Sequence, residues 1–389
     1  MASDGRHSGG VVATWSGDAL SAKDNPCNAS AELSVIVPTF NECENVGKLV
    51  DRLERALAGI RWEAVFVDDD SSDGTAEEIR SIARSDARVR CLQRIGRRGL
   101  SSACIEGMLS SSAPFIAVMD ADLQHDESIL PVMLSELKLS DVDIVVGSRY
   151  VDGGDVGDWQ RHRVLISRIA SIMSRIVSRV DLKDPMSGFF VIRRTAFMGA
   201  VRNLSTIGFK ILLDLFASSP KTLTFREVPY QFRSRSAGSS KLDLPAVWAY
   251  ILLILDKLVG RFVPIRFLSF LIIGGMGVVV HMIALAITFK GVSLGFEYSQ
   301  AMATLVSMTF NFFFNNMLTY SDLRLTGWRV LGGLFTFYMA CGLGAVANNG
   351  VAIAIFDFDH RWWLAGIVGV MMSAVWNYVV TSIFTWKNR

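Results

Sequence analysis

Two aspartates at the end of an apolar stretch are the residues of this sequence best suited to chemistry. Asp120 and Asp122 directly follow the segment 115–119, which has the composition of a buried strand. Carboxylates at positions i and i+2 can share one Mg²⁺ or Mn²⁺ with a substrate diphosphate, because both cations prefer oxygen ligands and usually keep substrate phosphates in their shell. The amide oxygen of Gln124 can complete such a set. We expect His125 to make a structural or polar contact rather than to bind the metal.

Polar residues also follow two other expected strands. The segment Pro38–Glu42 closes the first strand of the chain, and Asp69 closes the second. Ligands of parallel α/β sheets bind at the carboxyl ends of the strands, so a nucleotide base and ribose can lie across these two ends. The alternative is that Asn41 and Glu42 only cap the helix that follows them.

These residues need a scaffold, and the pattern of the chain from Leu33 onward predicts one. Short apolar stretches alternate there with segments of helical spacing. We expect strands over 33–37, 62–67, 89–92, 115–119 and 144–146, and helices over 44–57, 75–83 and 100–109. Strands separated by helices of roughly ten residues favour parallel βαβ units. The expected fold is therefore α/β with a mostly parallel sheet.

The composition excludes several classes of protein. With 51% hydrophobic and 20% charged residues, the 389-residue chain is neither disordered as a whole nor collagen-like. A net charge of +2 gives no reason to expect a nucleic-acid partner. The five cysteines form no CxxC pair, which argues against a disulfide framework or zinc site and favours a reducing compartment.

Charge is unevenly spread, and the last third of the chain resembles a membrane domain. Of the 39 basic and 37 acidic residues, only 11 lie in 266–389. Four apolar segments in that part reach the roughly 20 residues needed to cross a bilayer. If the first domain and both termini are cytoplasmic, six basic residues flank the cytoplasmic ends and two the opposite ends, as the positive-inside rule requires. The four segments are 267–289, 298–318, 330–356 and 362–385.

The apolar segments contain an internal repeat. Residues 310–320 match 376–386 at an offset of 66, and the glycine step 275–277 matches 342–344 at an offset of 67. The four segments are therefore expected to be two copies of a two-helix unit in the same orientation. Their asparagines either form hydrogen bonds between helices or give a polar lining for a lipid-linked headgroup.

Three further segments complete the organisation. Residues 1–31 lack periodicity and a secretory signal, and we expect a disordered tail. Residues 161–180 have the spacing of a basic amphipathic helix, which either lies on a membrane surface or packs on the sheet with a solvated basic face. The apolar run 244–255 is too short to span a bilayer and predicts an interfacial helix.

The motifs resemble a known family. VIVPTFNE, VDDDSSDGT, VMDADLQH, VGSRY and DPMSGFF are similar to those of the polyprenyl-phosphate glycosyltransferases of glycosyltransferase family 2. Within that family, they and the stretches GFKILLDL and EVPYQFRSRSAGSSKLD most resemble the dolichyl-phosphate mannose synthases. FNFFFNNMLTY and its repeat resemble a GtrA-like membrane domain. The resemblance implies a GT-A-type nucleotide-sugar-binding domain over 32–243, an interfacial linker over 244–264 and a four-helix transmembrane domain over 265–389.

The resemblance also implies roles for single residues. Arg149 and Arg163 would hold the acceptor lipid phosphate, although Arg161 and Arg168 lie close enough to leave the register of Arg163 open. The usual Gly-Glu-Ser-Lys motif has a serine at position 239 here, so that position is not counted as part of the site. Arg235 and Lys241 would close over the donor diphosphate, Asp120, Asp122 and Gln124 would hold the metal, and Pro38, Phe40, Glu42, Val67, Asp69, Asp120 and Ala121 would bind the nucleotide.

The implied reaction is the inverting transfer of a hexose to polyprenyl or dolichyl phosphate. A phosphate acceptor is already anionic near neutrality and needs no general base, which fits a chain with five histidines. Mannose from GDP-mannose is expected first, with UDP-glucose as the alternative donor. A processive polysaccharide synthase is disfavoured because a Gln-x-x-Arg-Trp motif is missing.

The membrane half leaves a further question open. It either anchors the transferase or moves the lipid-linked sugar across the bilayer. The expected location is the inner membrane of a bacterium, as a multi-pass protein with a cytoplasmic catalytic domain. A homo-oligomer is compatible with the sequence, which does not fix the oligomeric state.

Overall fold

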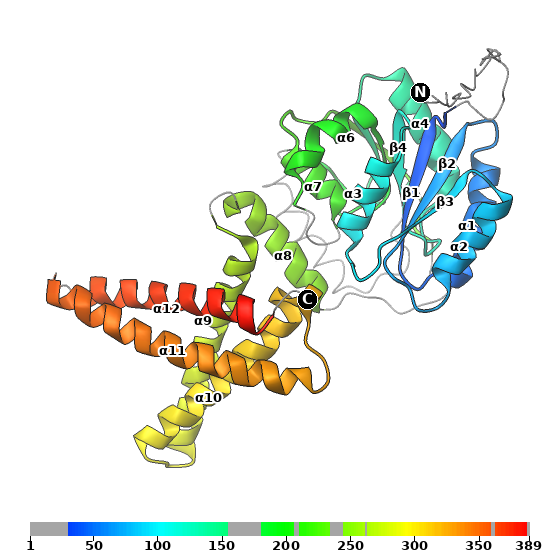
Figure 1. The fold of residues 1–389 in the computed structure, drawn as a ribbon. Helices are drawn as coiled ribbons and strands as arrows, with labels where there is room; N and C mark the ends of the chain where they lie inside the picture. The colour runs from blue at the N-terminus through cyan, green and yellow to red at the C-terminus, as the bar shows by residue number, and fades with distance from the viewer. Residues whose placement is uncertain are drawn as a thin grey trace, which may run out of the picture. The chain divides into compact units, whose positions relative to one another are not determined.

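The computed structural model describes residues 30–154, 180–205, 210–233, 244–260, 263–358 and 362–386 (Figure 1). Nearly all of the expected tail and of the basic segment 161–180 falls outside these ranges. So do three of the residues predicted for the site, namely Arg163, Arg235 and Lys241.

A seven-stranded sheet is the centre of the N-terminal domain. In the described part of the chain, its strand order is β3-β2-β1-β4-β6-β5-β7, and β6 runs antiparallel to both of its neighbours while the other pairs are parallel. The expected mostly parallel sheet is therefore confirmed. The strands are β1 (Leu33–Thr39), β2 (Trp62–Asp68), β3 (Val89–Gln93), β4 (Phe115–Val118), β5 (Ile144–Ser148), β6 (Phe190–Arg193) and β7 (Phe225–Pro229).

The strand ends that precede the candidate chemical residues lie at one edge of this sheet. Thr39 of β1 pairs with Asp68 of β2, and Ile36 of β1 pairs with Val118 of β4. Because β6 is antiparallel to both β4 and β5, those two strands run in the same direction, and the chain leaves β5 after Ser148 at the same edge. The loops after β1, β2, β4 and β5 therefore meet there.

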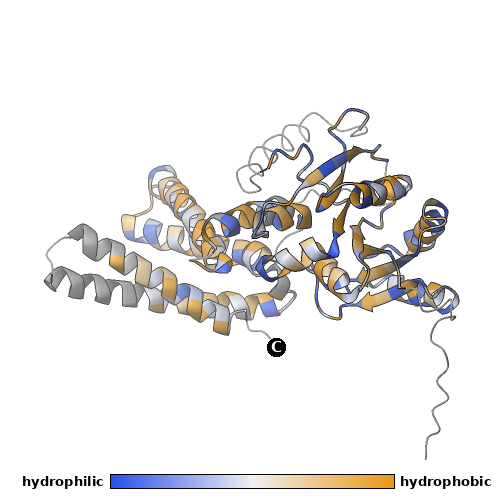
Figure 2. Ribbon diagram, turned by 90° about the horizontal axis from the view of Figure 1, so that it is seen from above, coloured by the Kyte–Doolittle hydropathy of each residue, from blue (hydrophilic) through white to orange (hydrophobic). Residues whose placement is uncertain are grey.

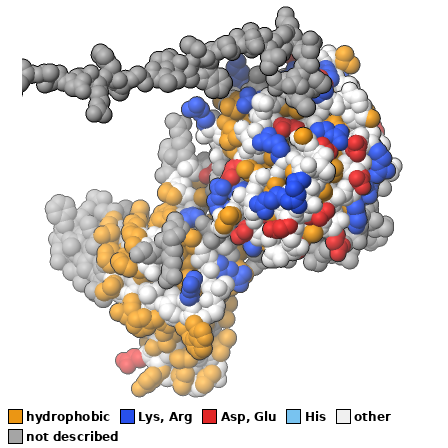
Figure 3. Space-filling model, turned by 45° about the vertical axis from the view of Figure 1, so that its right-hand side comes forward, with side chains coloured by type: hydrophobic (Ala, Val, Ile, Leu, Met, Phe, Trp, Pro, Cys, Tyr) orange, Lys and Arg blue, Asp and Glu red, His pale blue; other side chains and the backbone are white. Residues whose placement is uncertain are grey.

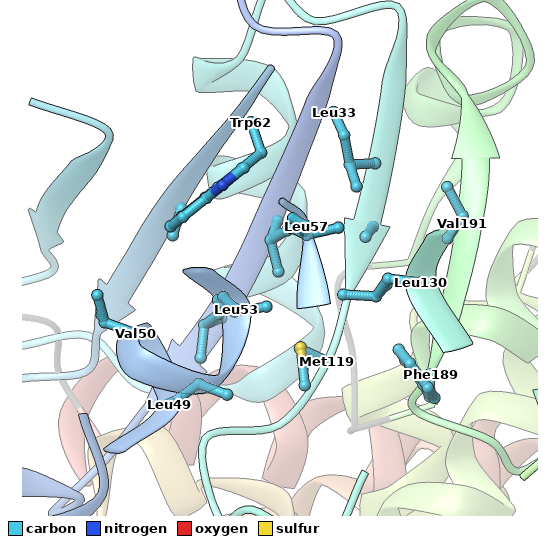
Figure 4. Packing of buried hydrophobic residues seen from close by; sticks show 14 of the residues in the cluster. Leu33, Leu49, Val50, Leu53, Leu57, Trp62, Met119, Leu130, Phe189 and Val191 are labelled. Atoms are coloured by element: carbon cyan, nitrogen blue, oxygen red, sulfur yellow. The ribbon is translucent and has the colours of Figure 1, made fainter. Parts of the chain in front are cut away.

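Helices cover both faces of the sheet, as the buried strands require. Alternate residues of β1 face opposite sides: Val35 and Val37 join a core with α1 and α4, whereas Ile36 joins a core with α3, α6 and α7. Figure 4 shows the first core, where Leu49 and Leu53 of α1 point toward the strands. The helices of this domain are α1 (Cys43–Ala56), α2 (Thr75–Ser85), α3 (Leu100–Ser110), α4 (Leu130–Leu139), α6 (Arg194–Ala200) and α7 (Ile211–Ser218).

The C-terminal part consists of apolar helices. They are α8 (Leu244–Val259), α9 (Ile265–Ala286), α10 (Phe296–Phe314), α11 (Arg329–Phe358) and α12 (Trp362–Phe384), with π-helical turns over Ile287–Gly291 and Asn315–Thr319. Among the described residues, Ile265–Gly291 is long and apolar enough to cross a membrane, with a mean hydropathy of 2.4. Helices α10, α11 and α12 lie where the other three spans are expected. Figure 2 colours the described parts of these helices mostly as hydrophobic, and the face drawn in Figure 3 shows apolar side chains gathered on them and many charged side chains on the sheet domain.

The internal repeat of the sequence corresponds to two helix pairs, α9 with α10 and α11 with α12, which make equivalent contacts within each pair and between the pairs. Ser269 and Thr319 share a hydrogen bond of 2.6 Å, and their repeat equivalents, Thr336 and Thr385, share one of 3.1 Å. Rings also pair reciprocally, with Phe270 against Tyr378 and Phe337 against Phe312. The equivalent residues Tyr320 and Trp386 stack on each other with centroids 4.1 Å apart. In the ring pairs, a contact from the first unit to the second is repeated by the equivalent residues from the second unit to the first. Such reciprocal contacts are typical of two-fold symmetry, so a pseudo-two-fold axis relates the two units.

An ion pair joins α8 to the sheet domain. Lys257 Nζ lies 2.6 Å from Asp214 Oδ1 of α7, and Asp214 is fully buried whereas the Lys257 side chain is 12% exposed. Asp214 also accepts hydrogen bonds from the backbone N–H of Ser205 and the hydroxyl of Ser218. Tyr250, Leu253 and Ile254 of α8 pack against Leu213 of α7 in a small apolar cluster. Helix α8 is thus held to the sheet domain by charge as well as by apolar contact.

Candidate active site

The loop after β4 holds the two aspartates predicted to bind metal. Leu123 takes a left-handed backbone conformation with φ 62°, and its side chain is buried in the core, which anchors the loop. Asp122 Oδ1 accepts a hydrogen bond from the backbone N–H of Gln124. Two hydrogen bonds join the loop to the segment after β7: Gln124 Nε2 donates to Arg233 O at 3.1 Å, and Arg233 N donates to Gln124 O at 3.0 Å. The loop is therefore fixed both to the core and to a second segment of the sheet domain.

The donor set of this loop fits a hard divalent cation. Asp120 and Asp122 offer carboxylate oxygens, and Gln124 offers an amide oxygen, which are the ligand types that Mg²⁺ and Mn²⁺ prefer. Within the described residues, no group of three or more His, Cys, Asp or Glu side chains could enclose a metal ion. The two carboxylates therefore suit an open site, in which a substrate supplies the remaining oxygens, rather than a closed structural site.

His125 lies directly behind the first aspartate. Its ring is 3% exposed, and its Nδ1 accepts a hydrogen bond of 3.1 Å from the backbone N–H of Asp120. Burial lowers the pKa of His125, so the ring is neutral near pH 7. The expectation that His125 makes a structural contact fits this placement.

Arg149 follows β5 and is held by a buried carboxylate. Its Nε and Nη2 donate to Asp184 Oδ2 and Oδ1, both at 2.8 Å, and its backbone N–H also donates to Oδ2. Asp184 is fully buried and Arg149 is 10% exposed. Burial lowers the pKa of Arg149, but the hydrogen bonds and charge of Asp184 outweigh it, and the pKa rises. The guanidinium is thus a permanent cation in a fixed orientation.

Lys210 is a second cation at this end of the sheet. Its Nζ donates to the backbone oxygen of Met186 at 3.3 Å. Burial, together with the charge of Arg149, lowers the pKa of Lys210 to about 8, while the charges of Asp120 and Asp184 act in the opposite direction. Because these charges act on one ammonium group, the loop after β4, the Arg149–Asp184 pair and Lys210 form one electrostatic cluster.

The predicted nucleoside end of the site is built on Asp69. This carboxylate is 7% exposed, and it accepts hydrogen bonds of 2.7 Å from Arg94 Nη1 and from the backbone N–H of Gly99. Burial raises the pKa of Asp69, and the bonds from Gly99 and Arg94 partly offset the rise. On the neighbouring loop, the Arg98 guanidinium lies 4.3 Å from the centroid of the Phe40 ring.

The other predicted nucleotide residues differ in exposure. Pro38, Phe40 and Glu42 are partly exposed, whereas Val67 and Ala121 are buried. Glu42 precedes α1 without capping it through its side chain, and Glu42 Oε2 instead accepts a hydrogen bond from Asn45 Nδ2 at 2.6 Å. The loop after β2 and the first residue of α2 supply partners for the start of α1, because the backbone N–H of Cys43 donates to Asp73 Oδ2 and that of Glu42 donates to Thr75 Oγ1.

Comparison with known proteins agrees with this geometry. Residues 34–199 match the family described as Glycosyl transferase family 2, and residues 269–386 match the GtrA/DPMS transmembrane domain. The dolichol-phosphate mannosyltransferase of Pyrococcus furiosus is 35% identical over 357 residues, which cover 91% of this chain and 99% of that protein. The dolichol-phosphate mannosyltransferase of Saccharomyces cerevisiae is 34% identical over 242 residues, covering 60% of this chain and 89% of that protein.

The chain belongs to the dolichol-phosphate mannosyltransferase family. It is therefore a glycosyltransferase with a GtrA-like membrane domain, which confirms the resemblance seen in its motifs. Among solved structures, glucosyl-3-phosphoglycerate synthase from Mycobacterium tuberculosis is 18% identical with a TM-score of 0.43, and the match covers 59% of this chain and 80% of that chain. That likeness is too distant to bear on the activity.

Two residues of the candidate site, Asp184 and Lys210, have no role in the prediction from sequence. Asp184 and Lys210 lie in the motifs DPMSGFF and GFKILLDL, which support the family resemblance without giving either residue a function. A charged residue beside an apolar segment in each motif is the signal that could have drawn attention to them.

Proposed function

We propose that this glycosyltransferase transfers mannose from GDP-mannose to the phosphate of a polyprenyl or dolichyl lipid. The observation that carries the proposal is the electrostatic cluster of Asp120, Arg149, Asp184 and Lys210 at the carboxyl edge of the sheet. It combines carboxylates suited to a divalent cation with two cations suited to phosphate groups. The similar proteins carry the name dolichol-phosphate mannosyltransferase, which supports mannose and a dolichyl acceptor.

Metal binding belongs to this proposal. Asp120, Asp122 and Gln124 would hold Mg²⁺ or Mn²⁺, which supplies Lewis-acid stabilisation of the departing nucleoside diphosphate. Lys210 would add a positive charge beside the same diphosphate, because it lies in the cluster and is protonated below a pH of about 8. We also assign Arg235 and Lys241 to the donor diphosphate from the family resemblance.

The acceptor would be held by Arg149. Its planar guanidinium can bind phosphate oxygens with paired hydrogen bonds, and Asp184 fixes its orientation before the acceptor arrives. Arg163 is assigned to the same phosphate from the resemblance. The acceptor phosphate attacks the anomeric carbon without a general base because it is already anionic near neutrality. The bond from that carbon to the nucleoside diphosphate breaks as the new bond to the phosphate oxygen forms, with inversion.

The nucleoside would lie across the ends of β1 and β2. Asp69, held by Arg94 and Gly99, offers carboxylate oxygens to a base, and the partly exposed Phe40 and Glu42 lie on the neighbouring loop. Pro38, Val67, Asp120 and Ala121 complete the assignment from the family resemblance.

The membrane arrangement is part of the proposal. We place the catalytic domain (32–243) and both termini in the cytoplasm of a bacterium, the segment 244–264 at the surface of the inner membrane, and four spans within 265–389. The excess of basic residues at the cytoplasmic ends of the apolar segments supports this topology. Labelling of single cysteines introduced into the loops before α10 and before α12 tests it, because both loops should react only from the periplasmic side.

A direct assay tests the donor and the acceptor. The purified full chain in detergent receives radiolabelled GDP-mannose or UDP-glucose, Mg²⁺ and polyprenyl phosphate, and labelled lipid is measured after organic extraction. Mannosyl lipid from GDP-mannose is the expected product. Asp122→Asn should form at least about 100-fold less, whereas Asp51→Asn, at an exposed site on α1, should match the wild type. Label in lipid from UDP-glucose alone would refute mannose as the sugar.

A further inference from the structure

The imidazole of His125 connects the backbone of the metal-binding loop to a rigid support. Its Nδ1 accepts the backbone N–H of Asp120 at 3.1 Å, and because that partner is a donor, the ring carries its own proton on Nε2. Nε2 lies 3.9 Å from Asp120 Oδ2, which is too long for a hydrogen bond. The link between the ring and Asp120 therefore runs through the main chain.

Aromatic side chains hold this ring in place. Phe189 stacks on it with centroids 5.1 Å apart and planes at 13°, and Tyr230 and Phe232 meet it edge-on at 5.9 and 6.1 Å. Phe189 precedes β6, and the other two rings follow β7, so residues from three parts of the chain meet at the imidazole.

Gly188 closes the remaining side. A Cβ atom at this position would lie 3.6 Å from His125 Cε1 and 3.4 Å from Asp120 Oδ2, so Gly188 lies beside both the imidazole and the carboxylate. The hydrogen bond to the imidazole, together with the rings packed around it, therefore ties the main chain of Asp120 to the core of the domain.

We propose that His125 is a positioning residue that aims the Asp120 carboxylate at a divalent cation through its hydrogen bond to the Asp120 main chain. The inference rests on the proposed metal site and adds to it a residue that does not touch the metal. Partners that orient a ligating side chain typically contribute about 10–100-fold to metal affinity. The role requires no proton transfer.

Two substitutions separate the hydrogen bond from the packing. His125→Phe keeps a ring packed among Phe189, Tyr230 and Phe232, but it cannot accept the hydrogen bond from the Asp120 backbone N–H. In His125→Asn the amide oxygen can replace Nδ1 as the acceptor of that hydrogen bond. The full-length protein in detergent is titrated with Mn²⁺ alone, and free Mn²⁺ is followed by electron paramagnetic resonance. Phe216→Leu is the control for a general loss of packing, because the buried Phe216 ring packs against Phe225. Thermal unfolding is recorded for each variant.

We expect His125→Phe to weaken Mn²⁺ binding by about 10–100-fold. His125→Asn should bind close to the wild type, and Phe216→Leu should bind as the wild type does. The inference is overturned if His125→Phe binds Mn²⁺ normally, if His125→Asn is as weak as His125→Phe, or if Phe216→Leu is equally weak. A wild type that binds no Mn²⁺ would overturn the metal site of the proposed function as well, whereas the other failures leave it intact.

Discussion

Removing the charge of Asp184 would leave the guanidinium of Arg149 largely buried without a charge partner. Asp184 is fully buried, Arg149 is 10% exposed, and three hydrogen bonds join them. Breaking a buried ion pair by removing one partner typically costs about 3–5 kcal/mol. We expect Asp184→Asn to lower the free energy of unfolding by an amount in that range and to weaken the use of polyprenyl phosphate.

A second variant distinguishes the structural role of the pair from its role toward the acceptor. Arg149→Met combined with Asp184→Asn removes both charges and keeps an amide oxygen for the backbone N–H of residue 149. We expect this double variant to recover much of the lost stability, because no buried charge remains unpaired. Transfer should stay low, since the cation that binds the acceptor phosphate at this position is then missing.

The two properties are measured on the same protein in detergent. Chemical denaturation gives the free energy of unfolding, and initial rates at varied polyprenyl phosphate give KM and kcat. If Asp184→Asn unfolds like the wild type, the ion pair does not stabilise the fold as the structure indicates. If the double variant uses the acceptor with a normal KM, Arg149 does not bind the acceptor phosphate.

Three further predictions concern the metal, the lysine and the membrane domain. Asp122→Asn and treatment with EDTA should each reduce transfer by at least about 100-fold, because a bound cation contributes several kcal/mol to charge stabilisation, and added Mg²⁺ should rescue only the EDTA-treated wild type. Since burial lowers the pKa of Lys210 to about 8, kcat/KM for the donor should fall as the pH rises through 8, and in Lys210→Arg this fall should be absent. Gly277→Val should destabilise the membrane domain by about 1–3 kcal/mol, because a Cβ atom there overlaps the Asn311 amide. Gly274→Val, where a Cβ atom has nothing within 4 Å, should be neutral in the same unfolding assay.

The sequence predicts the first half of the sheet well because its signals there are local. A run of β-branched residues predicts β1, an apolar run predicts β2 and a short segment predicts β3, and each expected strand ends within two residues of the observed one. The sequence prediction does not include β6 and β7. They have four and five residues, and β6 enters between β4 and β5 in the antiparallel direction, which depends on pairing over long distances in the chain.

In the candidate site, too, local signals could be read from the sequence, whereas contacts between distant parts of the chain could not. Asp69, Asp120 and Asp122 could be placed together from sequence because each follows a strand of a parallel sheet. The pairing of Arg149 with Asp184 could not, because it brings together residues 35 positions apart through the order of β4, β6 and β5. The fall in the pKa of Lys210 also depends on burial, which no local pattern encodes.

A series of contacts connects the candidate site to the apolar helices, and such a connection suits an acceptor that is carried by a membrane lipid. Lys210 immediately precedes α7, where Asp214 pairs with Lys257 of α8 at 2.6 Å. Trp248 of α8 in turn donates a hydrogen bond of 3.2 Å to Ser269 of α9. In the proposed function the acceptor phosphate stays at the membrane surface, so Lys210 would have to keep its place relative to the lipid. The Lys257–Asp214 pair, in which Asp214 is fully buried, supplies a link of that kind.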